Sequence, residues 1–175
     1  FAYAVASGGL PKLEQLVLYS NSIGDVGMQA FASAVASGSL PQLRELWLNA
    51  KQIGDGGMQA FASAVASGSL PQLRELHLNR NQIGDGGMQA FASAVASGAL
   101  AHLGELYLVD NPISDKTKDT MRTAISKSGG RVLVCLRQPP SLVRLAIYAN
   151  NDPLRPGLLA QLADYVWDGV CDLGE

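Results

Sequence analysis

The sequence predicts an α/β solenoid, in which short parallel strands line the concave side of a curved array and helices line its convex side. Residues 41–70 and 71–100 are near copies that differ at only four positions. Each copy holds a short run of alternating apolar residues, followed by a longer run with helical periodicity. Repeats of 20–50 residues are typical of solenoids, whose units bury their apolar faces against their neighbours.

The strand of each unit is predicted from the alternation around Leu46 and Leu48. Successive side chains of a strand point to opposite faces, so these leucines point one way and Glu45, Trp47 and Asn49 the other. Four units share the pattern L-x-x-L-x-L-x-x-N-x-I, and they begin at Leu13, Leu43, Leu73 and Leu103. Because strands lie about 4.8 Å apart and helices are about 10–12 Å wide, the stack is expected to curve.

A glycine-rich turn, residues 54–57 in the second unit, is expected to start each helix. Asp55 suits the N-cap position, where a carboxylate accepts backbone N–H bonds. The same acid recurs in each unit, as Asp25, Asp55, Asp85 and Asp115. One carboxylate per step of about 5 Å is no metal cluster, so we interpret these residues as helix caps.

The helix itself is predicted from apolar residues at i, i+3, i+4 and i+7, which are Met58, Phe61, Ala62 and Val65 in the second unit. Gly68 suits the left-handed residue that ends a helix. A single unit cannot cover its own apolar faces, so the array is expected to be stable only as a stack.

These four patterns in register resemble the leucine-rich repeat family over about residues 1–130, and the period resembles its ribonuclease-inhibitor-like branch. The resemblance implies a leucine-rich-repeat solenoid, a curved horseshoe segment that recognises proteins through its strands. It also implies a buried asparagine ladder made by Asn21, Asn81 and Asn111. Lys51 interrupts this ladder, because an ammonium group cannot accept the bonds that an amide oxygen accepts. We expect Lys51 to turn toward solvent, and Lys51→Asn to stabilise the array by ~1 kcal/mol.

The repeats are expected to divide the chain at about residue 130. They comprise a partial repeat 1–10, repeats 11–40, 41–70 and 71–100, and a decayed repeat 101–130. Since residues 1–10 match the back half of a repeat, we interpret the chain as a fragment of a longer array.

Residues 131–175 are predicted to form a C-terminal cap, with an independent functional tail as the alternative. An apolar run at 132–136 predicts a further strand, and a run at 142–147 predicts an antiparallel return or a displaced strand. A helix is expected near 156–168. Cys135 and Cys171 are interpreted as free thiols, with a disulfide as the alternative.

Composition and motifs argue against several classes of function. The net charge of −2 does not suit a nucleic-acid-binding surface, and no apolar run approaches the ~20 residues of a membrane span. His77 and His102 are the only histidines, and neither has the neighbours of a catalytic triad. The glycine turn lacks the Lys-Ser/Thr of a phosphate loop. We therefore expect a cytoplasmic protein that is not an enzyme, with no cofactor, metal or small-molecule substrate.

The predicted binding surface lies on the outward face of the strands and in the turn after each strand. Its residues are Tyr19, Glu45, Trp47, Asn49, Glu75, His77, Asn79, Arg80, Glu105 and Tyr107. Three of the four differences between the two near copies fall here, at 47/77, 50/80 and 51/81, although drift after a duplication would also produce differences. Trp47 and Tyr107 are the expected anchors, since exposed aromatic residues often dominate interfaces.

The three glutamates would repel one another on adjacent strands. Arg44, Arg74, Arg80 or a basic patch on the partner has to offset that repulsion. The sequence thus predicts a protein–protein interaction module that binds its partner on the concave strand face. A regulator similar to Ran GTPase-activating proteins, the ligand-sensing end of a nucleotide-binding leucine-rich-repeat receptor and a structural spacer are the alternatives.

Overall fold

The computed structural model describes residues 10–18, 23–127, 133–135 and 171–173. Within these ranges a single sheet runs in the order β1-β2-β3-β4-β5-β6. Its strands are Gln15–Val17, Glu45–Trp47, Glu75–His77, Glu105–Tyr107, Leu133–Cys135 and Cys171–Leu173. The helices are α2 (Gly24–Ala36), α3 (Asp55–Ala66), α4 (Asp85–Ala96) and α5 (Asp115–Lys127).

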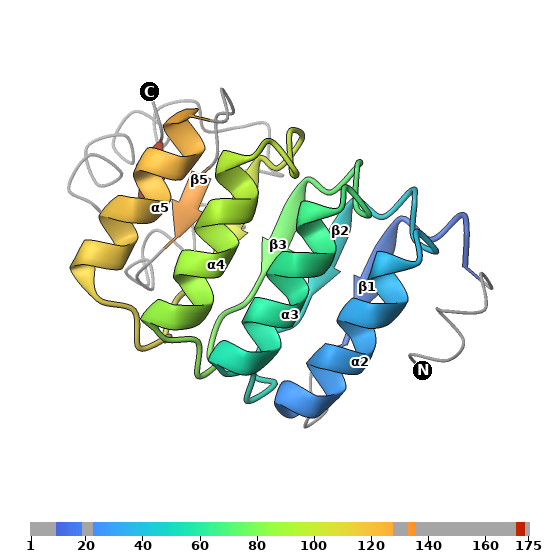
Figure 1. The fold of residues 1–175 in the computed structure, drawn as a ribbon, viewed down its shortest axis with the longest axis horizontal. Helices are drawn as coiled ribbons and strands as arrows, with labels where there is room; N and C mark the ends of the chain where they lie inside the picture. Colours follow the sequence, from blue (N-terminus) through green and yellow to red (C-terminus); the bar gives the residue numbers. More distant parts are fainter. Residues whose placement is uncertain (1–9, 19–22, 128–132, 136–170, 174–175) are drawn as a thin grey trace, which may run out of the picture.

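Neighbouring strands from β1 to β5 pair in parallel; paired residues are 30 positions apart from β1 to β4, as in Glu45 with Glu75, and 28 apart between β4 and β5, as in Glu105 with Leu133. The helices lie side by side across one face of the sheet (Figure 1). The predicted α/β solenoid is therefore confirmed. β5 falls inside the strand predicted at 132–136, whereas the antiparallel pairing of β5 with β6 was not predicted from the sequence.

Some expectations fall outside the described ranges. These are the helix of the partial repeat 1–10, the run at 142–147 and the helix near 156–168. The division of the chain at residue 130 stays a prediction. None of the helices in the described part is long and apolar enough to cross a membrane.

The core lies between the strands and the helices, where the repeating leucines meet the apolar helix faces. Leu46, Leu48 and Phe61 are fully buried. Burial of each such side chain stabilises the fold by roughly 1.5–3 kcal/mol. Phe61 and Phe91 stack with their ring centroids 6.3 Å apart, so the core is continuous from one repeat to the next.

The recurring aspartate does cap a helix, but not its own. The N-cap residue of α3 is Gly54, which makes no side-chain cap bond. Instead the Asp25 carboxylate accepts hydrogen bonds from the backbone N–H groups of Gly54 at 2.6 Å and Gly57 at 3.0 Å. Asp55 accepts from Gly84 in the same way, at 2.7 Å. The expectation of a cap within each repeat was therefore wrong, because the carboxylate reaches the helix start of the following repeat.

The contact between each aspartate and the helix start of the following repeat explains why that helix start is rich in glycine. A Cβ atom at Gly57 would lie 2.8 Å from Asp25 Oδ1, and one at Gly86 would lie 2.9 Å from Asp55 Oδ2. Both distances are shorter than a carbon atom allows. The glycine turn thus leaves room for the aspartate of the preceding repeat.

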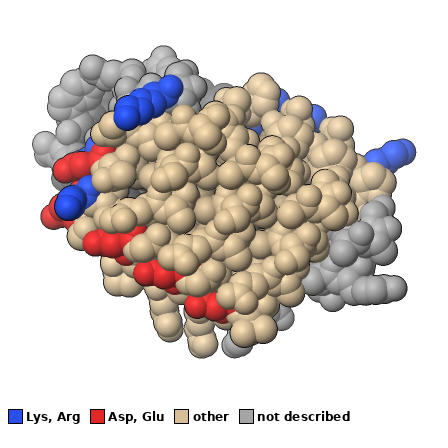
Figure 2. Space-filling model, viewed as in Figure 1, with Lys and Arg blue, Asp and Glu red and all other residues tan. Residues whose placement is uncertain are grey.

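The acidic caps are also visible at the surface. Figure 2 shows a helix face almost free of charge, except for acidic residues along the edge at which the helices begin and charged residues near α5.

The predicted asparagine ladder is confirmed at Asn81. Its amide oxygen accepts hydrogen bonds from the backbone N–H groups of Lys51 at 2.9 Å and Ile53 at 3.2 Å. Its amide nitrogen donates to the carbonyls of Leu48 at 2.8 Å and Leu78 at 2.9 Å.

Asn111 repeats the arrangement one repeat later. Its oxygen accepts from Ile83, and its nitrogen donates to Leu78 and Leu108. Each of these asparagines therefore ties two successive turns together. Asn21 lies outside the described residues.

Lys51 does not turn toward solvent, so that expectation was wrong. Its side chain is fully buried, and among the described residues its Nζ atom has no hydrogen-bond partner. The reason lies in its position in the turn. Lys51 stands where the next repeat has Asn81, whose side chain points into the turn and bonds the backbone there. Loss of solvent lowers the pKa of the Lys51 ammonium.

Candidate interaction surface on the strand face

Three rings stack in a line on the face of the sheet that is opposite the helices. Parallel register places Trp47 beside His77, and His77 beside Tyr107. The ring centroids of Trp47 and His77 are 4.0 Å apart with an interplanar angle of 18°, and those of His77 and Tyr107 are 4.2 Å apart at 8°. We call these three residues the ring row.

Stacking changes what the ring row can present to a partner. Each interior ring face is covered by the neighbouring ring, and His77 in the middle is only 8% exposed. Trp47 and Tyr107 are partly buried. The row consequently offers mainly ring edges, because the sheet register places Val17 beside Trp47 and Cys135 beside Tyr107.

A parallel row of carboxylates runs beside the rings. It consists of Glu45, Glu75 and Glu105, each two residues before the ring of its own strand, and we call it the glutamate row. The register places the three glutamates directly opposite one another on neighbouring strands. Adjacent strands lie about 4.8 Å apart, so three negative groups are held close together.

Each ring brings its polar atom to the carboxylate of its own strand. Trp47 Nε1 donates to Glu45 Oε2 at 3.4 Å, and the Tyr107 hydroxyl donates to Glu105 Oε2. His77 Nε2 lies 3.5 Å from Glu75 Oε2, and among the described residues this nitrogen has no hydrogen-bond partner.

On the first strand, Gln15 Nε2 also donates to Glu45 Oε2, at 2.5 Å. In each strand the ring thus contacts Oε2 of the glutamate of its own strand, and Gln15 contacts the same atom of Glu45. The carboxylates are held along one line.

The carboxylates of the glutamate row repel one another, and the effect is resolved at the middle member, Glu75. Burial raises the pKa of Glu75, and the negative charges of Glu105 and Glu45 raise it further. Arg44 pairs with Glu14 at 3.3 Å and Arg80 with Asp110 at 3.4 Å. Neither ion pair includes a member of the glutamate row, so these arginines do not supply the offset expected from the sequence.

His77 does not supply the missing positive charge either. Burial lowers the pKa of this imidazole, although Glu105 and Glu45 act in the opposite direction. Its ordinary value is already below neutrality. The ring is therefore uncharged at neutral pH.

The remaining predicted site residues differ in what they contribute. Asn49 accepts a hydrogen bond from the backbone N–H of Asn79 at 3.0 Å, and Asn79 accepts one from Val109 at 2.8 Å. These two asparagines form a second, outer ladder between repeats, which sequence reasoning missed; recurrence of Asn one residue after the L-x-L motif was the available signal. Arg80 is exposed. Tyr19 lies outside the described residues, and binding by any of these residues stays a prediction.

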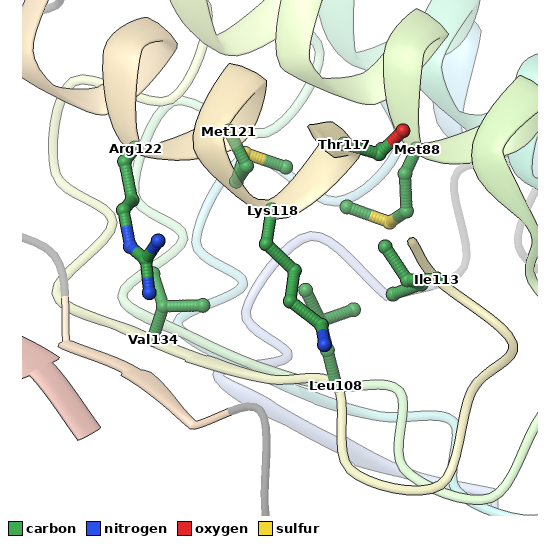
Figure 3. Close-up of a pocket in the computed structure, with 8 residues that line it drawn as sticks. All are labelled: Met88, Leu108, Ile113, Thr117, Lys118, Met121, Arg122 and Val134. Atoms are coloured by element: carbon green, nitrogen blue, oxygen red, sulfur yellow. The ribbon is translucent and has the colours of Figure 1, made fainter. Parts of the chain in front are cut away.

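Elsewhere the described residues form an open groove of about 360 Å³ along α4 and α5, lined by Ala92, Ser93, Ala96, Lys116, Asp119, Thr120, Thr123, Ala124 and Lys127. A cavity of about 10 Å³ lies under α5 (Figure 3) and is close to the space that one water molecule needs. Its lining residues are Met88, Leu108, Ile113, Thr117, Lys118, Met121, Arg122 and Val134. No group of three or more His, Cys, Asp or Glu in the described ranges is arranged to hold a metal ion.

Comparisons with known proteins agree with the repeat pattern and the fold. Residues 9–32 and 70–92 match the model of the Leucine Rich repeat family. No curated protein matches the sequence.

Among solved structures, the chain is similar to the leiomodin-1 actin-binding site 2, with a TM-score of 0.61 and 17% identity over 95% of this chain and 90% of that one. It is also similar to the tropomodulin C-terminal domain of Caenorhabditis elegans, with a TM-score of 0.61 and 13% identity over 93% of this chain and 96% of that one. At this level of sequence identity, the similarity shows a shared fold and nothing further. The chain thus carries leucine-rich repeats at residues 9–32 and 70–92 and folds as a leucine-rich-repeat α/β solenoid.

Proposed function

We propose that this protein is a non-enzymatic binding module that holds a protein partner on its strand face. The observation that carries the proposal is the glutamate row, where three carboxylates stand in register and where burial, together with the charges of the two outer members, raises the pKa of Glu75. Charge held in this way destabilises the free protein. A partner that brings positive charge relieves it, and this gives the partner a reason to bind here.

The chemistry of the face favours a protein with a basic patch. The middle of the opposite, helical surface is almost free of charge, and its acidic residues lie along the edge at which the helices begin and near α5 (Figure 2). The middle of that surface therefore offers such a partner little electrostatic attraction. Complementary charge steers encounter and suppresses wrong partners. The indole and phenol beside the carboxylates add apolar contact of the kind that anchors interfaces.

The experiment compares two double variants in a pull-down from cell extract. Trp47→Ala/Tyr107→Ala removes both ends of the ring row, and Gln59→Ala/Gln89→Ala changes exposed positions of α3 and α4. We expect the strand-face variant to lose the partners that the wild type retains, and the helix variant to keep them. Loss by the helix variant alone would place the binding surface on the wrong face.

Assays with purified proteins then distinguish between the candidate partners. Actin is included because one similar structure is titled an actin-binding site, and co-sedimentation with actin filaments measures that interaction. Stimulation of GTP hydrolysis by Ran tests the GTPase-activating alternative. The receptor alternative is tested by determining the full-length gene, which should then encode a nucleotide-binding domain upstream.

A further inference from the structure

The three rings and the three glutamates act as one unit rather than as two independent rows. In each strand the ring's polar atom lies at or near hydrogen-bond distance of the same glutamate oxygen, Oε2. The rings in turn fix one another by stacking at 4.0 and 4.2 Å. This arrangement limits the rotamers of Glu45, Glu75 and Glu105 before any partner arrives.

We infer that the glutamates make the decisive contacts, that the rings are positioning residues, and that the occupant is an extended segment with arginines at alternate positions. The inference rests on the proposed strand-face function and names the partner's chemistry. It also reassigns Trp47 and Tyr107, which the sequence predicted to be anchors in their own right. Fixed carboxylates lose little conformational freedom on binding, and such preorganisation raises affinity.

The spacing of the row selects the occupant. Two strand steps of about 4.8 Å separate Glu45 from Glu105, or about 9.6 Å in all. Side chains on one face of an extended segment recur at about 6.6–6.8 Å. Two successive arginines therefore fit within the row, each between two carboxylates. A guanidinium group suits this place because its planar fork donates to two oxygens at once.

The binding assay uses a defined probe, a fluorescein-labelled nine-residue peptide with arginine at every second position and glycine elsewhere. Its anisotropy is titrated with the full chain at low salt. A peptide with citrulline in place of each arginine keeps the shape and removes the charge. We expect the arginine peptide to bind and the citrulline peptide not to bind.

Two charge-matched variants locate the contact. Glu75→Gln/Glu105→Gln removes two charges from the row, and Asp115→Asn/Asp119→Asn removes two exposed charges from α5. Loss of two exposed ion pairs should weaken binding to the first variant about two- to thirtyfold. The second variant should change the affinity by less than about twofold. Equal losses in both variants would overturn the assignment of the glutamates.

A double-mutant cycle tests the positioning role. Tyr107→Phe keeps the stacked ring and removes only the hydroxyl that holds Glu105. We expect it to weaken peptide binding about two- to fivefold in the wild type and to have no effect in a Glu105→Gln background. An equal effect in both backgrounds would show that the tyrosine does not act through Glu105.

The two double variants distinguish a failure of this inference from a failure of the proposed strand-face function. If Trp47→Ala/Tyr107→Ala loses the cellular partner while Glu75→Gln/Glu105→Gln keeps it, the strand face still binds but the glutamates do not decide the contact. If neither variant loses the partner, the strand-face function itself is wrong.

Discussion

Replacement of Lys51 by asparagine should stabilise the protein. The lysine occupies the ladder position of the second repeat, where its buried Nζ has no hydrogen-bond partner among the described residues. Asn81 shows what an amide does at the equivalent position, with two bonds accepted and two donated at 2.8–3.2 Å. The variant therefore removes an unsatisfied group and supplies a rung of the ladder.

The magnitude follows from these two contributions. A buried polar group without a partner costs about 1–3 kcal/mol, and each new hydrogen bond contributes about 1 kcal/mol. We expect a gain of about 2–4 kcal/mol, more than the ~1 kcal/mol expected for a solvent-exposed lysine. For a protein of this size, 1 kcal/mol shifts Tm by roughly 2–4 °C, so Tm should rise by about 4–16 °C.

The gain should depend on pH, with a sign fixed by the direction of the pKa shift. Burial lowers the pKa of Lys51 in the folded state below its ordinary value of 10.5. Between the two values the unfolded chain binds the proton and the folded chain does not. The wild type therefore gains stability as pH rises through this window, and the advantage of the asparagine variant over the wild type shrinks.

Thermal unfolding followed by circular dichroism at about pH 7 and about pH 10 measures both effects. Lys51→Met separates them, because it removes the charge without restoring the ladder. Lys12→Asn changes an exposed lysine and serves as the control. A Tm of Lys51→Asn equal to or below that of the wild type would refute the reasoning.

Three further predictions concern the contacts between repeats and the glutamate row. Asn81→Ala should destabilise the protein by about 2–4 kcal/mol, because buried backbone groups of two repeats lose their partners; urea unfolding measures the loss, and a change below about 0.5 kcal/mol would contradict the ladder. Gly86→Ala should destabilise the wild type, because the added Cβ atom crowds the Asp55 carboxylate. In an Asp55→Ala background the same change should stabilise the protein by up to about 1 kcal/mol, because alanine favours the helix more than glycine does. A stability change of the same sign in both backgrounds would exclude a clash with Asp55. Glu75→Gln should raise Tm at neutral pH and lose that advantage in acid. The reason is that the pKa of Glu75 is raised in the folded protein, so the wild type becomes less stable as pH rises from about 4.5 through the pKa of the folded state. A change in Tm that does not depend on pH would argue against repulsion within the glutamate row.

The repeat unit was predictable because both of its periodicities are local. Alternation around Leu46 and the spacing of Met58 and Phe61 predict a strand and a helix without knowledge of their neighbours. The identity of the near copies then fixes the register, and Glu45, Glu75 and Glu105 follow as a row. The row and the rings beside it were thus predicted from the sequence and found on one face.

What the sequence could not predict depends on contacts between repeats. An aspartate at a helix start suits its own N-cap, and only the fold shows that Asp25 reaches the backbone of Gly54. A lysine in a turn is normally exposed, whereas Lys51 occupies the inward-pointing position that Asn81 holds in the next repeat, and it is fully buried. Stacking of the rings and their bonds to the glutamates also require side-chain positions.

The most direct measurement of the binding surface is photo-crosslinking to the partner isolated in the pull-down. A photo-reactive amino acid replaces Val17, which is 39% exposed next to Trp47, or Ser63, which is exposed on α3. We predict a covalent adduct with the partner from position 17 and none from position 63, detected by mass spectrometry. An adduct from position 63 alone would contradict binding on the strand face.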